Sequence, residues 1–246
     1  MITIAKTPAH LAAAAAMFCA SYISETVNRR GRCAILLAGG STPQALYEAL
    51  SRVPYADNLP WSQVVVAFGD ERLVPPHDAR SNQRMARRAL LDAVPIKPEF
   101  LLTADTSLPP ADAAAAYEKR LRTFFNLKEG ALPEFDLVFL GLGPDGHTAS
   151  LFPGMAAVEE TQRLVVAASA PDPAGPARIS VTLPVLNAAR TVVFLVQGAD
   201  KAAIVARVLH ADAEAGESLP AQRIRPVGEG AEVRWFIDEA AAADLR

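Results

Sequence analysis

Residues 33–43 read CAILLAGGSTP, and this stretch decides the fold class. Its first six residues, Cys33–Ala38, form an apolar run typical of a strand that is buried on both faces. Two glycines follow, and then Ser41, Thr42 and Pro43, which favour the cap and first turn of a helix. A buried strand that leads through a glycine turn into a helix is the basic unit of a sheet covered by helices.

The same alternation continues along the chain. Further strands are predicted at Val64–Phe68, Phe135–Leu140, Leu164–Ala168, Ile179–Leu183, Thr191–Val196 and Glu232–Ile237. Helices are predicted after the Thr7 cap and over Pro43–Arg52, Ser81–Leu91, Ala111–Phe125, Ala199–Leu209 and Asp238–Leu245. We therefore expect a single α/β domain over residues 1–246, with a doubly wound, mainly parallel sheet and helices on both faces, in a Rossmann-like arrangement. Such sheets bind ligands beyond the carboxyl ends of their strands.

Composition limits the possible partners. The 246 residues are 51% hydrophobic and carry a net charge of −3, so we expect no nucleic-acid partner. No apolar stretch approaches the length of a membrane span, and no membrane partner is expected. Cys19 and Cys33 show neither metal-ligand spacing nor a disulfide framework, which favours a reducing, cytoplasmic location. No dimerisation element stands out, and we expect a monomer.

The first loop that follows a predicted strand contains Gly39, Gly40, Ser41 and Thr42. Its glycines allow close approach of the backbone to a ligand, and the free amides of the following helix favour an anion. We expect Ser41 or Thr42 to cap that helix. The alternative is a capped turn without a ligand. The loop is not a P-loop, because the lysine of that motif is missing.

The second loop follows Val64–Phe68 and contains three consecutive charged residues, Asp70, Glu71 and Arg72. A solvated face is the simple explanation for such a run. The functional interpretation is that Arg72 presents its planar guanidinium to substrate oxygens, with a carboxylate to orient it.

The third loop, residues 141–147, reads GLGPDGH and matches G-x-G-x-x-G. A dinucleotide site is rejected, because Pro153 and Gly154 cut short the helix that such a loop should open. The loop instead presents Asp145 beside His147. A histidine next to a carboxylate at the tip of a strand suits general-base catalysis near neutral pH. The alternative is a loop histidine bonded to a backbone carbonyl.

Two further cations are candidates for an anion site. Arg178 begins the strand RISVTL, and Lys201 lies in the predicted first turn of the helix that follows Gly198. A lysine there opposes the helix dipole unless an anion lies between the two. An ordinary exposed lysine is the alternative.

Together these loops resemble the 6-phosphogluconolactonase family, within the glucosamine-6-phosphate deaminase-like superfamily. The resemblance runs from LAGGSTP (Leu37–Pro43) through FGDERLVPPHDARSN (Phe68–Asn82) and GLGPDGHTASLFPG (Gly141–Gly154) to Lys201. The deaminases of the superfamily have tyrosine where this chain has Arg72. They also have a glutamate where it has Phe152, which cannot transfer protons.

The resemblance implies hydrolysis of 6-phospho-D-glucono-1,5-lactone in the oxidative pentose phosphate pathway, without a metal or an organic cofactor. For the mechanism, we expect His147 to be the general base, Asp145 to orient it or only to shape the loop, and Arg72 and loop amides to stabilise the oxyanion. The expected substrate- and phosphate-binding residues are Gly39, Gly40, Ser41, Thr42, Asp70, Arg178 and Lys201. A non-catalytic sugar-phosphate sensor is one alternative, and glucosamine-6-phosphate deaminase is another.

Overall fold

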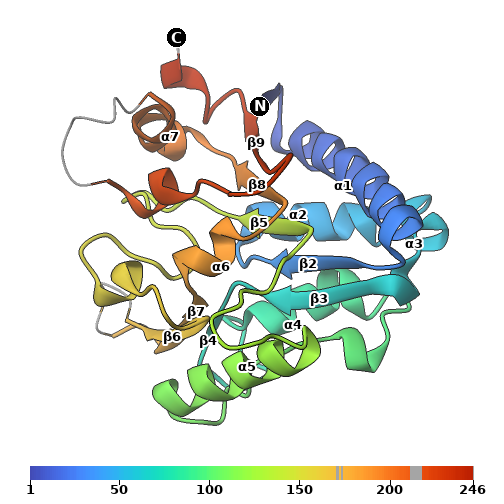
Figure 1. The fold of residues 1–246 in the computed structure, drawn as a ribbon. Coiled ribbons are helices and arrows are strands. Elements are labelled where there is room, and N and C mark those ends of the chain that lie inside the picture. Colours follow the sequence, from blue (N-terminus) through green and yellow to red (C-terminus); the bar gives the residue numbers. More distant parts are fainter. Residues whose placement is uncertain (170–171, 173, 211–217, 246) are drawn as a thin grey trace.

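A computed structural model describes residues 1–169, 172, 174–210 and 218–245. Its centre is a six-stranded sheet in which every neighbouring pair is parallel (Figure 1). The strands lie in the order β1 (Ile2–Ala5), β9 (Glu232–Asp238), β8 (Thr191–Val196), β5 (Leu137–Leu140), β2 (Cys33–Leu37) and β3 (Val64–Phe68). All six therefore end at the same edge of the sheet, where the predicted loops were expected to gather.

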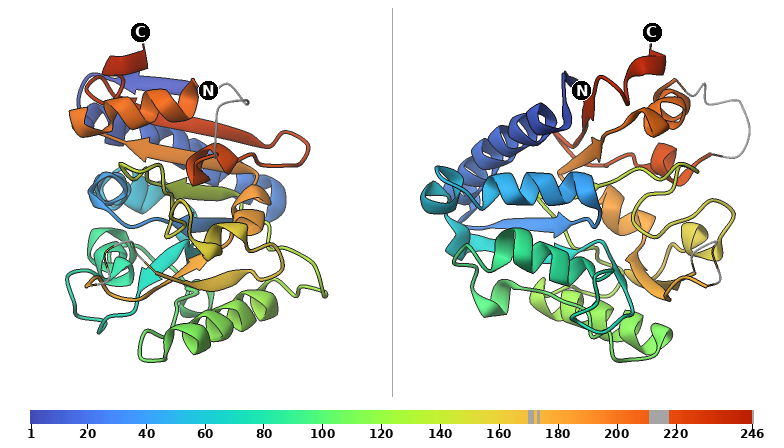
Figure 2. Two further views of the ribbon diagram at one scale, coloured as in Figure 1. Left: turned by 90° about the vertical axis from the view of Figure 1, so that its left-hand side faces the viewer. Right: turned by 180° about the vertical axis from the view of Figure 1, so that it is seen from behind.

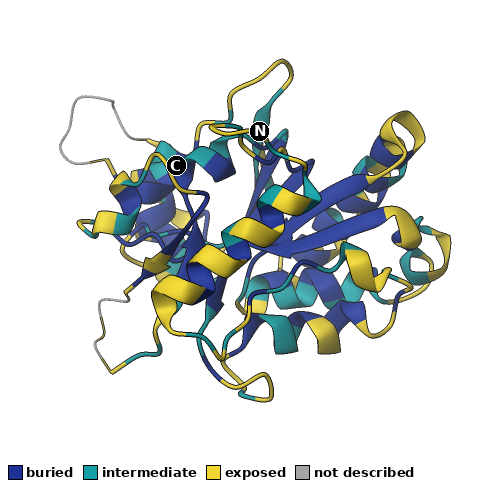
Figure 3. Cartoon of the chain, turned by 60° about the horizontal axis from the view of Figure 1, so that its bottom comes forward, coloured by how far each residue is buried: buried dark blue, intermediate teal, exposed yellow. Residues whose placement is uncertain are grey.

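Helices cover both faces of this sheet (Figure 2). One face packs against α1 (Pro8–Arg30) and α2 (Ser41–Leu50), and the other packs against α5 (Pro110–Phe124), α6 (Leu183–Asn187) and α7 (Ala202–Leu209). The strands are buried along most of their length, and the exposed residues lie on the outer sides of the helices and in the loops (Figure 3). The predicted doubly wound α/β fold is thereby confirmed.

Strand β2 explains why two separate cores form. Its odd-numbered residues, such as Cys33 and Ile35, join the apolar cluster under α1 and α2. Its even-numbered residues, Ala34 and Leu36, join the cluster under α5 and α7. Because successive side chains of a strand point to opposite faces, a run that is apolar throughout must be covered on both sides.

A second, smaller sheet was not expected from the sequence. It contains β4 (Asp70–Arg72), β7 (Arg178–Val181) and β6 (Val165–Ala168), all paired antiparallel. Strand β4 continues directly from β3, and the amide of Val181 donates to the carbonyl of Gly69 at 2.8 Å. The small sheet therefore brings residue 178 to the edge where the central strands end.

The predicted helix over Asp238–Leu245 is wrong. Strand β9 extends to Asp238, whose carboxylate accepts hydrogen bonds from the amides of Gly198 at 3.0 Å and Ala241 at 2.8 Å. These bonds hold the chain in turns, and only a short 3₁₀ segment, Ala243–Leu245, follows. At the other end of the chain, Thr7 caps α1 as expected and accepts from the amide of His10 at 3.3 Å.

Short helical segments complete the described fold. They are α3 (Tyr55–Asn58), α4 (Asn82–Ala86), a π-helical turn (Arg87–Leu91) and 3₁₀ turns at Trp61–Gln63, Pro98–Phe100, Ala156–Glu159, Ala199–Lys201 and Pro220–Arg223. Among the described residues, no helix is both long and apolar enough to cross a membrane.

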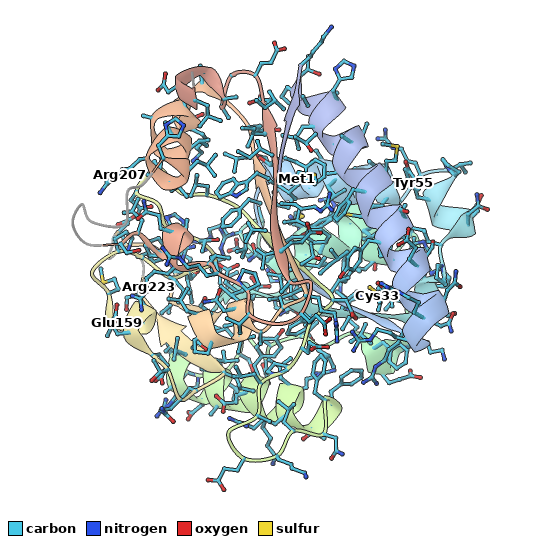
Figure 4. The ribbon with its side chains drawn as sticks, turned by 45° about the horizontal axis from the view of Figure 1, so that its top comes forward. Met1, Cys33, Tyr55, Glu159, Arg207 and Arg223 are labelled. Carbon is cyan, nitrogen blue, oxygen red and sulfur yellow. The ribbon has the colours of Figure 1, made fainter. Side chains whose placement is uncertain are left out.

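Both cysteines are buried and free. Cys19 lies on α1, and Cys33 begins β2 close to that helix (Figure 4). Burial raises the pKa of both thiols well above the usual range. Both groups therefore belong to the core.

Candidate active site

A cavity of about 280 Å³ lies beyond the carboxyl ends of the central strands. Five separate chain segments meet there: the loop after β2, strand β4, the loop after β5, the start of strand β7 and the segment after β8. The cavity is lined by nine of the ten predicted site residues: Gly39, Gly40, Ser41, Thr42, Asp70, Arg72, His147, Arg178 and Lys201. Asp145 is the exception: it does not line the cavity, but it contacts His147, which does.

The loop after β2 differs from expectation in one detail, because neither Ser41 nor Thr42 caps α2. Gly40 is the N-cap, with a φ of 103° that an L side chain rarely adopts, and the helix begins at Ser41, two residues before the predicted Pro43. No side chain caps this end, and the first-turn amides therefore remain available to an anion. Gly39 is also constrained, since a Cβ there would overlap the Asn82 side chain.

The two acids of β4 are buried, so the charged run is not a solvated face. Asp70 accepts hydrogen bonds from Ser150 Oγ at 2.6 Å and from Asn82 Nδ2 at 2.9 Å. Glu71 accepts from several groups, including the amide of Asn82 at 2.8 Å, and is 1% exposed. Burial still raises the pKa of Glu71 in spite of these bonds. Both carboxylates therefore fix the backbone of β4 and the chain that follows it.

Arg72 and Arg178 lie directly opposite each other across the β4–β7 pair. Like charges in such a position repel. The Nε atom of each arginine is buried without a hydrogen-bond partner. Burial, and next the charge of Arg72, lower the pKa of the Arg178 guanidinium. Among the described residues neither arginine forms an ion pair, although the charge of Asp70 acts in the opposite direction and by itself would raise the pKa of Arg178.

The expected carboxylate that orients Arg72 is not found among the described residues. Arg72 Nη1 instead donates to the backbone carbonyl of Arg80 at 2.7 Å. Both neighbouring acids, Asp70 and Glu71, already accept hydrogen bonds from other groups. A backbone carbonyl therefore fixes the guanidinium without neutralising its charge.

Lys201 contributes a third cation to the cavity. It ends the 3₁₀ turn Ala199–Lys201 and is the N-cap of α7, so it lies directly before that helix and not in its first turn as predicted. Its side chain is 21% exposed, and Nζ lies 3.8 Å from the carboxylate of Asp200, which is 76% exposed. Because Asp200 is so exposed, solvent screens this pair, and Asp200 compensates little of the charge of Lys201.

His147 and Asp145 form the pair that the sequence suggested. His147 Nδ1 lies 2.6 Å from Asp145 Oδ1, and the same oxygen accepts from the His147 amide at 3.1 Å. Asp145 thus orients the ring and shapes the loop at once. Burial alone would raise the pKa of Asp145, but its hydrogen bonds with His147 outweigh that effect and lower it. The carboxylate is therefore charged at neutral pH.

The geometry of the histidine loop depends on Gly143 and on a neighbouring segment. A Cβ on Gly143 would overlap the imidazole of His147, so a larger residue would displace the ring. The carbonyl of Gly146 accepts from the amide of Ala221 at 3.1 Å. That segment is joined to the rest of the protein by the Arg223–Glu159 ion pair, which lies on the side away from α1 (Figure 4).

Two residues of the site were missed from the sequence. The ring of Phe152 lies 4.3 Å from the ring of His147, and the Cζ atom of Arg178 lies 5.6 Å from the Phe152 ring centroid. Phe152 thus packs against the candidate base and one of the cations. Gln197, just after β8, lines the cavity, and its Oε1 is buried without a partner. Its place at a strand end was the only signal that could have found it.

Metal binding receives no support from clustering. Among the described residues, no three His, Cys, Asp or Glu side chains are grouped so that they could hold an ion.

Comparison with known proteins places this site in a family. Residues 6–235 match the family model described as glucosamine-6-phosphate isomerases/6-phosphogluconolactonase. The chain belongs to this family. The family resemblance expected from the three loops is thereby confirmed.

Relatives within the family are similar over most of their length. The 6-phosphogluconolactonase of Nostoc sp. is 42% identical over 224 residues, which cover 91% of this chain and 89% of that protein. The 6-phosphogluconolactonase of Rattus norvegicus is 39% identical over 244 residues, covering 98% and 92%. The solved structure of 6-phosphogluconolactonase from Trypanosoma brucei has a TM-score of 0.86 at 31% identity, covering 100% of this chain and 98% of the other.

Proposed function

We propose that this protein is an enzyme that hydrolyses 6-phospho-D-glucono-1,5-lactone to 6-phospho-D-gluconate in the pentose phosphate pathway. The observation that carries the proposal is that His147, hydrogen-bonded to Asp145, lines the same cavity as Arg72, Arg178 and Lys201. The names of the relatives at 39–42% identity over most of the chain support this substrate. The enzyme acts on a small molecule, and we propose that it works as a cytoplasmic monomer.

His147 acts as the general base. Asp145 accepts the Nδ1 proton, which leaves Nε2 of the neutral ring free to take a proton from water. The water oxygen forms a bond to C1 of the lactone, and the carbonyl electrons move to its oxygen. The tetrahedral intermediate then collapses, the bond between C1 and the ring oxygen breaks, and Nε2 returns the proton to that oxygen. The atoms balance with water as the only co-reactant.

The cations divide the remaining work between binding and catalysis. Arg178, Lys201 and the first-turn amides of α2 bind the phosphate, which lies far from the reacting carbon. Arg72, with the amides of the histidine loop, stabilises the negative charge that develops on the carbonyl oxygen. Binding energy from the phosphate then holds the carbonyl against the base.

The decisive experiment measures 6-phosphogluconate formation against spontaneous hydrolysis. The lactone is generated in the assay from glucose 6-phosphate, and the product is trapped by its dehydrogenase. Wild-type protein is expected to exceed the background, and His147→Ala to lose about 10²- to 10⁴-fold in kcat, as general-base catalysis predicts. His77→Ala, in an exposed loop, is the control and should keep full activity.

Two outcomes would contradict the proposal. Folded wild-type protein with no excess rate would rule out lactone hydrolysis. Release of ammonia from glucosamine 6-phosphate would then favour the deaminase, and calorimetric binding of 6-phosphogluconate without turnover would favour the sensor. A His147→Ala variant with near-normal kcat would keep the reaction but remove the proposed base.

A further inference from the structure

Strands β2 and β5 separate at the floor of the cavity. They pair in register at Ile35 with Leu137 and at Leu36 with Val138, and the register ends there. On its other side, β2 stays paired with β3 through Leu37, whose carbonyl accepts from the amide of Gly69 at 2.9 Å. The next residue, Ala38, therefore has a backbone amide and carbonyl on the side that β5 has left.

A buried tyrosine bonds both of these groups. The hydroxyl of Tyr47, on α2, accepts from the Ala38 amide at 2.9 Å and donates to the Ala38 carbonyl at 3.0 Å. Tyr47 is 0% exposed, and its ring packs 6.1 Å from the ring of Phe139 on β5. Burial raises the pKa of Tyr47, so the hydroxyl keeps the proton that it donates.

The separation lies between the two halves of the candidate site. The chain runs from β2 to β3 on one side of β2, whereas β5 lies on the other, so this is a point where the winding of the sheet changes direction. Ligands of such sheets bind in the crevice at this point. Ala38 and Gly39 line one wall of the cavity, and Gly141 and Leu142 line the other.

We propose that Tyr47 is a positioning residue that sets the distance between the phosphate loop and the histidine loop. Its hydroxyl replaces the backbone partner that β5 would supply, and it holds the end of β2 apart from β5. These bonds then fix the spacing between Ser41 and His147 for a substrate whose phosphate and carbonyl lie at opposite ends. This inference rests on the proposed function, because it takes one ligand to span both loops.

A second tyrosine provides a matched control. The hydroxyl of Tyr117, on α5, accepts from the amide of Phe68 at 2.8 Å and donates to its carbonyl at 3.0 Å. Tyr117 is also buried, but it caps the edge strand β3 from the opposite face of the sheet. The hydroxyl also lies 3.4 Å from the carbonyl of Leu102. Tyr117→Phe therefore removes the same pair of bonds to one backbone residue, and this longer contact, at the edge of the sheet and not between β2 and β5.

The test compares a ligand that spans both loops with one that fills only the phosphate site. Affinities for 6-phosphogluconate and for inorganic phosphate are measured by calorimetry on wild type, Tyr47→Phe and Tyr117→Phe. In Tyr47→Phe the two loops are no longer held at the right distance, and 6-phosphogluconate should bind about tenfold more weakly, as expected if the ligand loses one hydrogen bond with a charged group. Phosphate should change by less than about twofold. Tyr117→Phe should bind both ligands as wild type does.

Three results would overturn the inference: equal weakening of both ligands, no change in either, or the same pattern in Tyr117→Phe. If Tyr47→Phe does not fold, Phe139→Leu loosens the packing of the Tyr47 ring and should weaken 6-phosphogluconate selectively, though less. If the ratio of the two affinities, for 6-phosphogluconate and for phosphate, is unchanged in Phe139→Leu, that result also counts against the inference. Wild-type protein that does not hydrolyse the lactone would instead refute the proposed function. The two failures can be told apart, because this one requires no tyrosine variant.

Discussion

Two pairs of arginines lie at opposite ends of the central strands, and acids neutralise only one of them. Before the strands begin, Arg30 lies 3.0 Å from Glu134 and 3.1 Å from Asp136. Arg190 lies 2.6 Å from the same Glu134. Beyond the strand ends, Arg72 and Arg178 face each other, and neither forms an ion pair within the described part of the chain.

The difference separates cations that have an acidic partner in the protein from cations that have none among the described residues. Each arginine of the first pair has a permanent partner, so its charge contributes to stability. The second pair accepts mutual repulsion in the free protein, and an anion in the cavity would relieve it. The same residue type therefore has a different role at each end of one sheet.

The largest expected effect comes from removing the buried acid of the neutralised pair. The side chain of Asp136 is 5% exposed, and it also accepts from the amide of Ala34 at 2.8 Å. Asp136→Ala should lower the free energy of unfolding by about 3 kcal/mol, because the buried Ala34 amide loses its acceptor and Arg30 and Arg190 each lose one of their two acids. Chemical denaturation measures this loss, and KM should not change.

The exposed Arg87–Asp92 pair, at 3.6 Å, serves as the control. Asp92→Ala should cost less than about 1 kcal/mol. An equal loss of unfolding free energy in both variants would mean that the network around Asp136 stabilises the fold no more than an exposed ion pair does.

Removing Arg178 should affect substrate binding and leave stability unchanged or higher, the reverse of what is expected for Asp136. Arg178→Ala should raise KM for the phosphorylated lactone about 10- to 100-fold, since a hydrogen bond to a charged group contributes about 1.5–3 kcal/mol. Its stability should stay the same or rise, because a repulsion with Arg72 disappears. Steady-state kinetics and thermal unfolding measure the two effects. A similar rise of KM in Arg30→Ala would contradict the assignment of different roles to the two arginine pairs.

Ligand binding should raise the thermal stability of the protein only where the arginines beyond the strand ends are intact. At about ten times its Kd, 6-phosphogluconate should stabilise wild type by about 1.4 kcal/mol, because it binds only the folded state. Arg30→Ala should keep this gain, and Arg178→Ala should lose most of it at the same concentration. Differential scanning fluorimetry is sufficient for the measurement. Full stabilisation of Arg178→Ala would show that the phosphate binds elsewhere.

The smallest expected effect is the pH dependence of the neutralised pair. Burial alone would raise the pKa of Glu134, but hydrogen bonds from Arg30 and Arg190 lower it below its ordinary value of 4.5. Its contribution to stability is therefore complete above about pH 4.5 and is lost as the pH falls through the lowered pKa.

Glu134→Gln isolates this contribution. At neutral pH the variant should be less stable than wild type by less than about 1 kcal/mol, because the pair is half exposed. The two unfolding curves should converge in acid. The pKa of Asp136 is raised by burial and also by the charge of Glu134, so it is lower in the variant; this difference disappears as well once Glu134 is protonated. A difference that grows toward low pH would contradict this sign.

The central strands could be predicted because their signal is local. Strands at Val64–Phe68 and Thr191–Val196 have the predicted bounds, since each is an apolar run between polar turns. Strand β4 has no such signal. Three consecutive charged residues form it only because β7 pairs with them from more than a hundred positions away, and that pairing comes from tertiary structure.

The candidate site was predictable to a similar degree. Glycines, charges and a histidine at strand ends indicated which segments would meet. The partner of Arg72 was wrong, because a backbone carbonyl has no signature in a sequence. Phe152 was dismissed for lacking proton chemistry, although its contribution is the surface that it offers to His147 and Arg178. Packing roles of this kind depend on a neighbour that only the fold supplies.

The burial of both cysteines makes the protein easy to label at one chosen place. A thiol reacts with maleimides as the thiolate, and the raised pKa values and burial of Cys19 and Cys33 suppress that form. A cysteine introduced at Val53, which is 76% exposed, would be the reactive thiol of the chain. A single fluorophore could then be attached without first removing the native cysteines.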